Sequence, residues 1–219
     1  MSYFDFTGKT KIVDGITVHQ IVATIDIPTM EIAAGDTGGY VQHKGNLAHY
    51  AWVEDQAVVM GDALVDNGAL VCEYSCIRDN AYVSGGVIAS GDSCIEGNAC
   101  VIGGTDEDGM LFTLDVMDDV VIGGNARVVT SKEDDLYLSD NVVIMDNAMV
   151  TGDGVVCGDT IIRDNSVVVV HGTIDGRSTT MGNAVVNHTE GSSRRVMVEA
   201  IGNQRLIDDD STGWNPVTE

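Results

Sequence analysis

Aromatic residues and prolines are scarce in this sequence. Phe, Trp and Tyr make up 5% of the 219 residues and there are only two prolines, although a hydrophobic fraction of 44% is ample for a core. The shortage of proline excludes a proline-rich linker protein. No apolar run reaches the length of a membrane span, and the first residues lack the apolar core of a signal peptide, so we expect no membrane association.

Basic residues are also few. There are 11 Lys and Arg against 34 Asp and Glu, for a formal net charge of -23. A surface of this charge repels phosphates and anionic lipids, which disfavours direct binding to nucleic acid or to a membrane. Two interpretations stay open: the acids are solvated turn residues, or they form a surface that imitates DNA or binds a basic protein partner.

Cysteine is present but shows no metal-binding pattern. The five cysteines are an odd number without CxxC spacing, which indicates packing thiols in a reducing compartment rather than a zinc site. Cys76 and Cys94 lie eighteen residues apart and are expected as stacked neighbours on one outer face. The cysteines are Cys72, Cys76, Cys94, Cys100 and Cys157.

What the sequence does contain is a period of six. An aliphatic residue recurs at every sixth position from Val41 to Val101, and a small residue such as Ala51 or Ala57 follows four positions after each. The two positions before the small residue favour Gly, Asp and Asn. The pattern resumes at Val116 and again at Leu138, and the three blocks together hold about 22 hexapeptides.

A six-residue unit is one short strand and a turn, too small to bury its own apolar side chain. Stacking such units buries the aliphatic and the small residues in a narrow continuous core. Gly and Asn are expected at the corners because they tolerate left-handed backbone angles. The sequence therefore predicts an all-β fold, a parallel β-helix with small β caps at both ends.

The segments IGGNAR, IMDNAM, IRDNSV and TMGNAV resemble the hexapeptide-repeat proteins, whose motif is aliphatic-Gly-x-x-small-x. The opening segment, from ITVHQIVATIDI to GNLAHYAWV, is similar to a bacterial and prophage-associated subgroup assigned as acyltransferases. The resemblance covers roughly residues 16–186. It implies a left-handed β-helix with three hexapeptides per triangular coil, hence about seven coils and a length of roughly 35 Å. Because the cysteines indicate a reducing compartment, we expect a cytoplasmic protein, or a virion component if a phage encodes the chain.

The repeat divides the chain into three parts. Residues 1–40 are expected to form an N-terminal β cap, residues 41–189 the β-helix, and residues 190–219 a C-terminal cap and tail. The segment RRVMVEAIGNQRLI, around Gly202-Asn203, is expected to form a hairpin or a terminal strand pair, followed by a polar tail.

Two insertions interrupt the period, near residues 107–115 and 134–137. Three hexapeptides separate them, so in a triangular coil both leave the same corner. They would expose an apolar cluster rimmed with acids, a candidate protein-binding surface, unless the apolar groups fold back onto the wall. The candidate binding residues are Met110, Leu111, Phe112, Leu136, Tyr137, Asp106, Asp108, Asp134 and Asp135.

Catalytic residues are not evident. In the hexapeptide-repeat acyltransferases that this sequence resembles, a histidine acts as general base at a boundary between the subunits of a trimer. Neither insertion of this chain contains a histidine. His171 and His188 lie nearly one coil apart and are the weak catalytic candidates. The acids around Gly109 lack the spacing of a calcium-binding EF-hand, so no metal site and no cofactor are expected.

Three functions remain. The leading interpretation is a non-catalytic structural or protein-interaction module, acidic and self-associating, associated with a phage or prophage. The first alternative is a coenzyme A-dependent acyltransferase of the hexapeptide-repeat type. The second is an acidic DNA-mimic inhibitor of a host protein. The expected partners are a basic protein and further copies of the chain, with a trimer implied by the resemblance.

Overall fold

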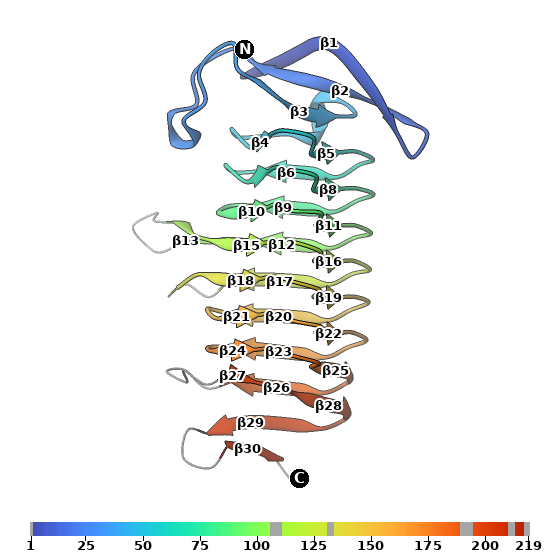
Figure 1. Ribbon diagram of the computed structural model, residues 1–219, viewed down its shortest axis with the longest axis vertical. Coiled ribbons are helices and arrows are strands. Elements are labelled where there is room, and N and C mark those ends of the chain that lie inside the picture. Colours follow the sequence, from blue (N-terminus) through green and yellow to red (C-terminus); the bar gives the residue numbers. More distant parts are fainter. Residues whose placement is uncertain (1, 106–110, 131–133, 189–194, 210–212, 217–219) are drawn as a thin grey trace.

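The computed structural model describes residues 2–105, 111–130, 134–188, 195–209 and 213–216. These residues form a parallel β-helix, in which successive short strands stack into the faces of a three-sided prism (Figure 1). The predicted fold class is confirmed. The described part of the chain contains no α-helix, and its helical turns are the short 3-10 helices η1 (Pro28–Met30) and η2 (Lys44–Asn46).

The three sheets are named face 1, face 2 and face 3 in the order in which a complete coil, such as β5, β6 and β7, visits them. Face 1 consists of β1 (Phe4–Val13), β2 (Ile16–Ala23), β3 (Thr37–Val41), β5 (Val58–Val59), β8 (Cys76–Ile77), β11 (Cys94–Ile95), β16 (Val121–Ile122), β19 (Val143–Ile144), β22 (Ile161–Ile162), β25 (Thr179–Gly182) and β28 (Glu199–Gly202). Face 2 consists of β6 (Leu64–Asp66), β9 (Tyr82–Ser84), β12 (Cys100–Ile102), β17 (Arg127–Thr130), β20 (Met149–Gly152), β23 (Val167–Val170), β26 (Val185–His188), β29 (Arg205–Asp209) and β30 (Gly213–Pro216). Face 3 consists of β4 (Trp52–Val53), β7 (Leu70–Val71), β10 (Val87–Ala89), β15 (Leu114–Val116), β18 (Leu136–Leu138), β21 (Val155–Val156), β24 (Thr173–Ile174) and β27 (Arg195–Val196).

The prism has about eight coils, since face 3 is an 8-stranded sheet. The hexapeptide count predicts about seven. The additional coil comes from the segment after residue 194, where β27, β28 and β29 pair in parallel with β24, β25 and β26 although the sequence period is lost. Backbone pairing therefore continues beyond the part of the chain that the repeat reveals.

The core is a narrow column with two inward side chains from each hexapeptide. On face 1 the aliphatic residues Val59, Ile77 and Ile95 are fully buried and stack directly on one another through the parallel register. The small residues Ala57 and Ala63 are buried beside them. At four of the small positions a hydroxyl donates to the carbonyl three residues earlier, as Ser75 does to Cys72 at 2.7 Å; the others are Thr160, Ser166 and Ser178.

The tight corners use Gly and Asp, not Asn, as the residue with positive φ. At the corner between faces 1 and 2, Asp79 has a φ of 63° and Gly97 a φ of 68°. The Asp79 carboxylate accepts a hydrogen bond from the Gly97 backbone N–H in the next coil, at 3.0 Å. The expectation that Asn adopts these angles is wrong with one exception, Asn67. Many of the acids therefore satisfy backbone donors at the turns.

The asparagines occupy the next position and stack into a ladder. Each side-chain amide donates to the Asn oxygen of the following coil, at 2.9 to 3.2 Å. The ladder contains Asn80, Asn98, Asn125, Asn147, Asn165, Asn183 and Asn203.

The N-terminal end of the prism is covered by an antiparallel hairpin. β1 and β2 pair around the turn at Asp14-Gly15, and β2 pairs with β3, which starts the parallel stack. Figure 1 shows the hairpin extending beyond the prism wall. Covering this end is necessary because an open strand edge invites pairing with other chains.

At the other end, Gly202-Asn203 forms a corner turn between β28 on face 1 and β29 on face 2. The predicted hairpin at this position is therefore wrong. The antiparallel pair is formed by β29 and β30 instead. The reason is that Gly202 has the positive φ of the other corners, which directs the chain around the prism rather than back on itself.

Candidate functional site

The candidate site lies at the corner between faces 2 and 3, which we call the 2/3 corner. The first insertion joins β12 to β15 and the second joins β17 to β18, so both leave this corner in successive coils. A third lengthening falls at residues 189–194, between β26 and β27, where paired residues such as Ile174 and Val196 are 22 positions apart. Figure 1 shows the described strands next to these connections, β13, β18 and β27, on the same side of the prism.

The strand pairing corrects the limits of the first insertion. Gly103 follows the β12 residue that pairs with Ser84, and Leu114 in β15 pairs with Val87. The nine extra residues are therefore 104–112, which include the antiparallel pair β13 (Gly104–Thr105) and β14 (Leu111–Phe112). Asp115 belongs to the prism wall. Phe112 is partly exposed, whereas Asp106, Asp108 and Met110 lie outside the described residues.

The second insertion also ends earlier in the chain than the sequence predicts. Leu136 and Tyr137 were expected in the exposed cluster, but both belong to β18. Leu136 is fully buried and pairs with Leu114 of the coil before it, so it is a core residue and not a surface residue. Because inward and outward side chains alternate along a strand, Tyr137 faces outward and stays partly exposed.

Asp135 connects the two insertions. Its Oδ1 accepts the Thr113 backbone N–H at 2.6 Å and its Oδ2 accepts the Tyr137 hydroxyl at 3.1 Å. The bond to Asp135 raises the pKa of Tyr137. Asp115, which pairs with Tyr137 in register, has a raised pKa because of burial and then because of the charge of Asp135. Exposed Asp134 completes this acidic group.

A histidine–carboxylate pair lies immediately beyond the insertions at the same corner. His171 Nδ1 is 2.7 Å from Asp153 Oδ1, and their side chains are only 20% and 10% exposed. His188, the other catalytic candidate, is fully buried at the end of β26, where the backbone pairs with Asp208. The two candidates therefore differ in setting: His171 faces the corner, and His188 lies inside the prism.

A second pair of this kind was not expected from the sequence. His49 Nδ1 is 2.6 Å from Asp66 Oδ1, again at the 2/3 corner but near the N-terminal cap. The Tyr82 hydroxyl donates to the other Asp66 oxygen at 3.3 Å. The sequence feature that could have identified both pairs is a spacing of about one coil: His49 and Asp66 are 17 residues apart, and Asp153 and His171 are 18 apart.

A groove of about 230 Å³ runs between the cap and the first insertion. Its walls include Met30 from η1, Leu70 and Ile88 from face 3, and Thr113. Beyond His49, this end of the corner thus offers an apolar surface, whereas the second insertion offers the carboxylates of Asp134 and Asp135.

The expected stacking of Cys76 and Cys94 is present, since the two residues pair in register on face 1. Among the described residues, no three metal-ligating side chains are close enough to bind an ion together. No helix in the same part of the chain has the length and apolarity that crossing a membrane requires. No protein-family model matches the sequence, and no curated protein is significantly similar to it.

Proposed function

We propose that this chain is a non-catalytic structural or protein-interaction module that self-associates or binds a partner protein through the 2/3 corner. The observation that carries the proposal is that all three lengthened connections leave this one corner. Random insertion would spread extra residues over three corners. Connecting segments on a rigid scaffold are the usual place for binding residues, because they change without disturbing the core.

The chemistry of the corner favours a partner with both basic and apolar groups. Asp134 is exposed, Asp135 and Asp153 are partly exposed, and Phe112 is a partly exposed apolar residue of the first insertion at the same corner. Such a mixed surface is typical of the rim and centre of a protein interface. A basic protein partner or a further copy of the chain, in a trimer as the resemblance implies, fits this description.

The test is to remove the first insertion without breaking the coil. Deleting residues 104–112 joins Gly103 to Thr113, which take the places of Gly85 and Gly86 in the preceding coil. We expect the mass in solution to fall to that of a monomer, or partner capture to be lost, with an unchanged far-ultraviolet spectrum. The matched control is Tyr74→Ser, which removes an exposed aromatic at a different corner. Association that survives the deletion and equals that of the control would refute the proposal.

His171 supports a second candidate, a coenzyme A-dependent acyltransferase. A carboxylate on one imidazole nitrogen fixes the orientation of the ring, so that the other nitrogen can face a substrate, as in a general base. The test is acyl transfer from acetyl-coenzyme A to small amines and alcohols, with His171→Gln and Asp153→Asn against the control His43→Gln. Turnover that depends on His171 and Asp153 supports the enzyme. No turnover at millimolar donor argues against it.

The DNA-mimic alternative has less support. A mimic needs carboxylates presented to a partner, whereas acids such as Asp79, Asp140 and Asp164 accept backbone N–H groups at the turns. The high negative charge of the chain therefore has a structural reason that involves no inhibited protein.

A further inference from the structure

Cys76 and Cys94 form a directly opposed pair of thiols on the outside of face 1. β8 and β11 are parallel, and Cys76 pairs in register with Cys94 just as Ile77 pairs with Ile95. The two isoleucines are fully buried, so the cysteines point outward, and both are partly exposed. Neighbouring strands lie about 4.8 Å apart, which falls within the Cα separations that a disulfide spans.

No other cysteine has a stacked thiol. Cys100 pairs in register with Tyr82 on one side and Arg127 on the other. The Cys157 thiol donates to Asp175 at 3.4 Å, and the Cys72 thiol donates to the Ala89 carbonyl at 3.6 Å. The alignment of two thiols in successive coils is thus particular to Cys76 and Cys94.

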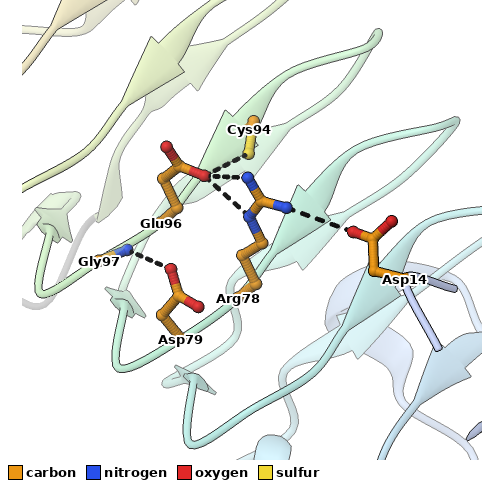
Figure 2. A network of polar contacts seen from close by, with 6 residues as sticks. All are labelled: Asp14, Arg78, Asp79, Cys94, Glu96 and Gly97. Carbon is orange, nitrogen blue, oxygen red and sulfur yellow. Dashed lines mark hydrogen bonds and ion pairs between the residues drawn. The ribbon is translucent and has the colours of Figure 1, made fainter. Parts of the chain in front are cut away.

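A guanidinium group lies beside the pair. Arg78, two residues after Cys76, forms an ion pair with Glu96 and a second one, at 3.3 Å, with Asp14 in the turn between β1 and β2. Figure 2 shows the Arg78 side chain between these two carboxylates, with the Cys94 thiol bonded to Glu96 at 3.7 Å. The arrangement keeps a positive charge next to the sulfur atoms.

The two thiols differ in acidity. The pKa of Cys76 is lowered, first by its interaction with the Cys94 thiol and then by the charge of Arg78, although burial opposes both. The pKa of Cys94 is raised by its interaction with Cys76 and further by burial. The difference favours Cys76 as the attacking thiol of the pair.

We propose that Cys76 and Cys94 are a reversible oxidation site, at which a small-molecule disulfide of the glutathione type converts the two thiols into an intramolecular disulfide. The geometry supports it because the second thiol already lies beside the first, so the mixed disulfide is resolved within the chain. Arg78 stabilises the attacking thiolate.

The reaction balances in two exchange steps. The Cys76 thiolate attacks one sulfur of the oxidant, the oxidant S–S bond breaks, and one small thiol leaves after taking up the proton that Cys76 lost. Cys94 then loses its proton and attacks the Cys76 sulfur, and the second small thiol leaves with that proton. Two protein thiols are oxidised, and one small disulfide is reduced to two thiols.

The bridge would form at the border of the N-terminal cap. Cys76 packs against the buried apolar cluster of Val18, Tyr40, Val58 and Met60, and Val13 and Ile16 of the hairpin pack against the same cluster. Oxidation would covalently join two successive coils next to the point where Arg78 holds the hairpin turn. The reduced and oxidised proteins should therefore differ in how firmly the cap is attached.

The test is a thiol count on the full chain in glutathione redox buffer. The reduced protein has five free cysteines. Under oxidising buffer we expect three titratable thiols, a peptide map with the Cys76–Cys94 link, and recovery of all five with dithiothreitol. Cys76→Ser should keep its four thiols. Cys94→Ser lacks the resolving thiol, so it should retain the mixed disulfide at Cys76 and show three titratable thiols. The control Cys72→Ser has four titratable thiols when reduced and should have two in oxidising buffer.

Two further variants test the role of the guanidinium. Arg78→Gln should slow bridge formation several-fold, and Arg78→Lys should restore most of the rate. Five thiols that persist in oxidising buffer, glutathione adducts without the internal link, or disulfide-bonded dimers on a non-reducing gel would each overturn the proposal.

Discussion

Asn147 donates its side-chain amide to the oxygen of Asn165 in the next coil, at an Nδ2 to Oδ1 distance of 3.0 Å. Asn147 also accepts from Asn125 at 2.9 Å, so its side chain joins the ladder on both sides. Asn147→Ala removes both bonds, and we expect a loss of about 1–2 kcal/mol in the free energy of unfolding. Asn80→Ala, at the end of the ladder, removes one bond and should cost about half as much. Urea denaturation of both variants measures the difference, and equal losses would contradict a ladder role.

The small inward position sets the width of the prism. Ala126 is fully buried between successive coils, and a longer side chain there has no space. Ala126→Leu should destabilise the protein by about 1–3 kcal/mol through overpacking. Arg127→Leu at the next position, which is exposed, is the control and should leave the thermal midpoint nearly unchanged. A tolerated leucine at residue 126 would mean that the core is wider than the structure indicates.

Gly152 is the glycine with the least room at the 2/3 corner. Its φ is 132°, and a Cβ atom would overlap the carbonyl of Val170 in the next coil. Gly152→Ala should therefore lower the thermal midpoint much more than Gly68→Ala, because Gly68 also has a positive φ but faces open space. Differential scanning fluorimetry compares the two. Similar midpoints would show that backbone strain, rather than the close approach of the coils, limits this position.

Asp115 should make the stability depend on pH. Its folded pKa is raised by burial and by Asp135, so the folded state holds this proton more tightly than the unfolded state does. Ionising Asp115 therefore destabilises the folded protein. This destabilisation is absent below the ordinary Asp pKa and reaches its full size once the pH exceeds the raised pKa. Asp115→Asn should thus raise the thermal midpoint at pH 7 and leave it nearly unchanged at pH 3. The exposed control Asp119→Asn should give no such difference. An Asp115→Asn gain at pH 3 that equals the gain at pH 7 would rule out titration of Asp115 as its cause.

The architecture could be predicted from the sequence because each inward position repeats with its neighbours in register. Val59, Ile77 and Ile95 stack directly because they are eighteen residues apart, which is one coil of three six-residue repeats. The limits of the insertions could not be read from the repeat. Leu114 and Leu136 look like insertion residues in the sequence, but they return to the wall because burying them stabilises the core.

Residue types alone determined that apolar groups fill a slim core and that Gly turns corners, because short-range sterics and burial depend on them directly. That Asp, and not Asn, adopts positive φ at the other corners was decided by the structure. Tertiary structure alone decided which polar groups meet. Asp14 contacts Arg78 across 64 positions of sequence, because the β1–β2 hairpin packs on face 1. His171 meets Asp153 because each turn of the prism places a residue over the equivalent residue of the preceding coil. Only the closed coil sets the distance between their side chains.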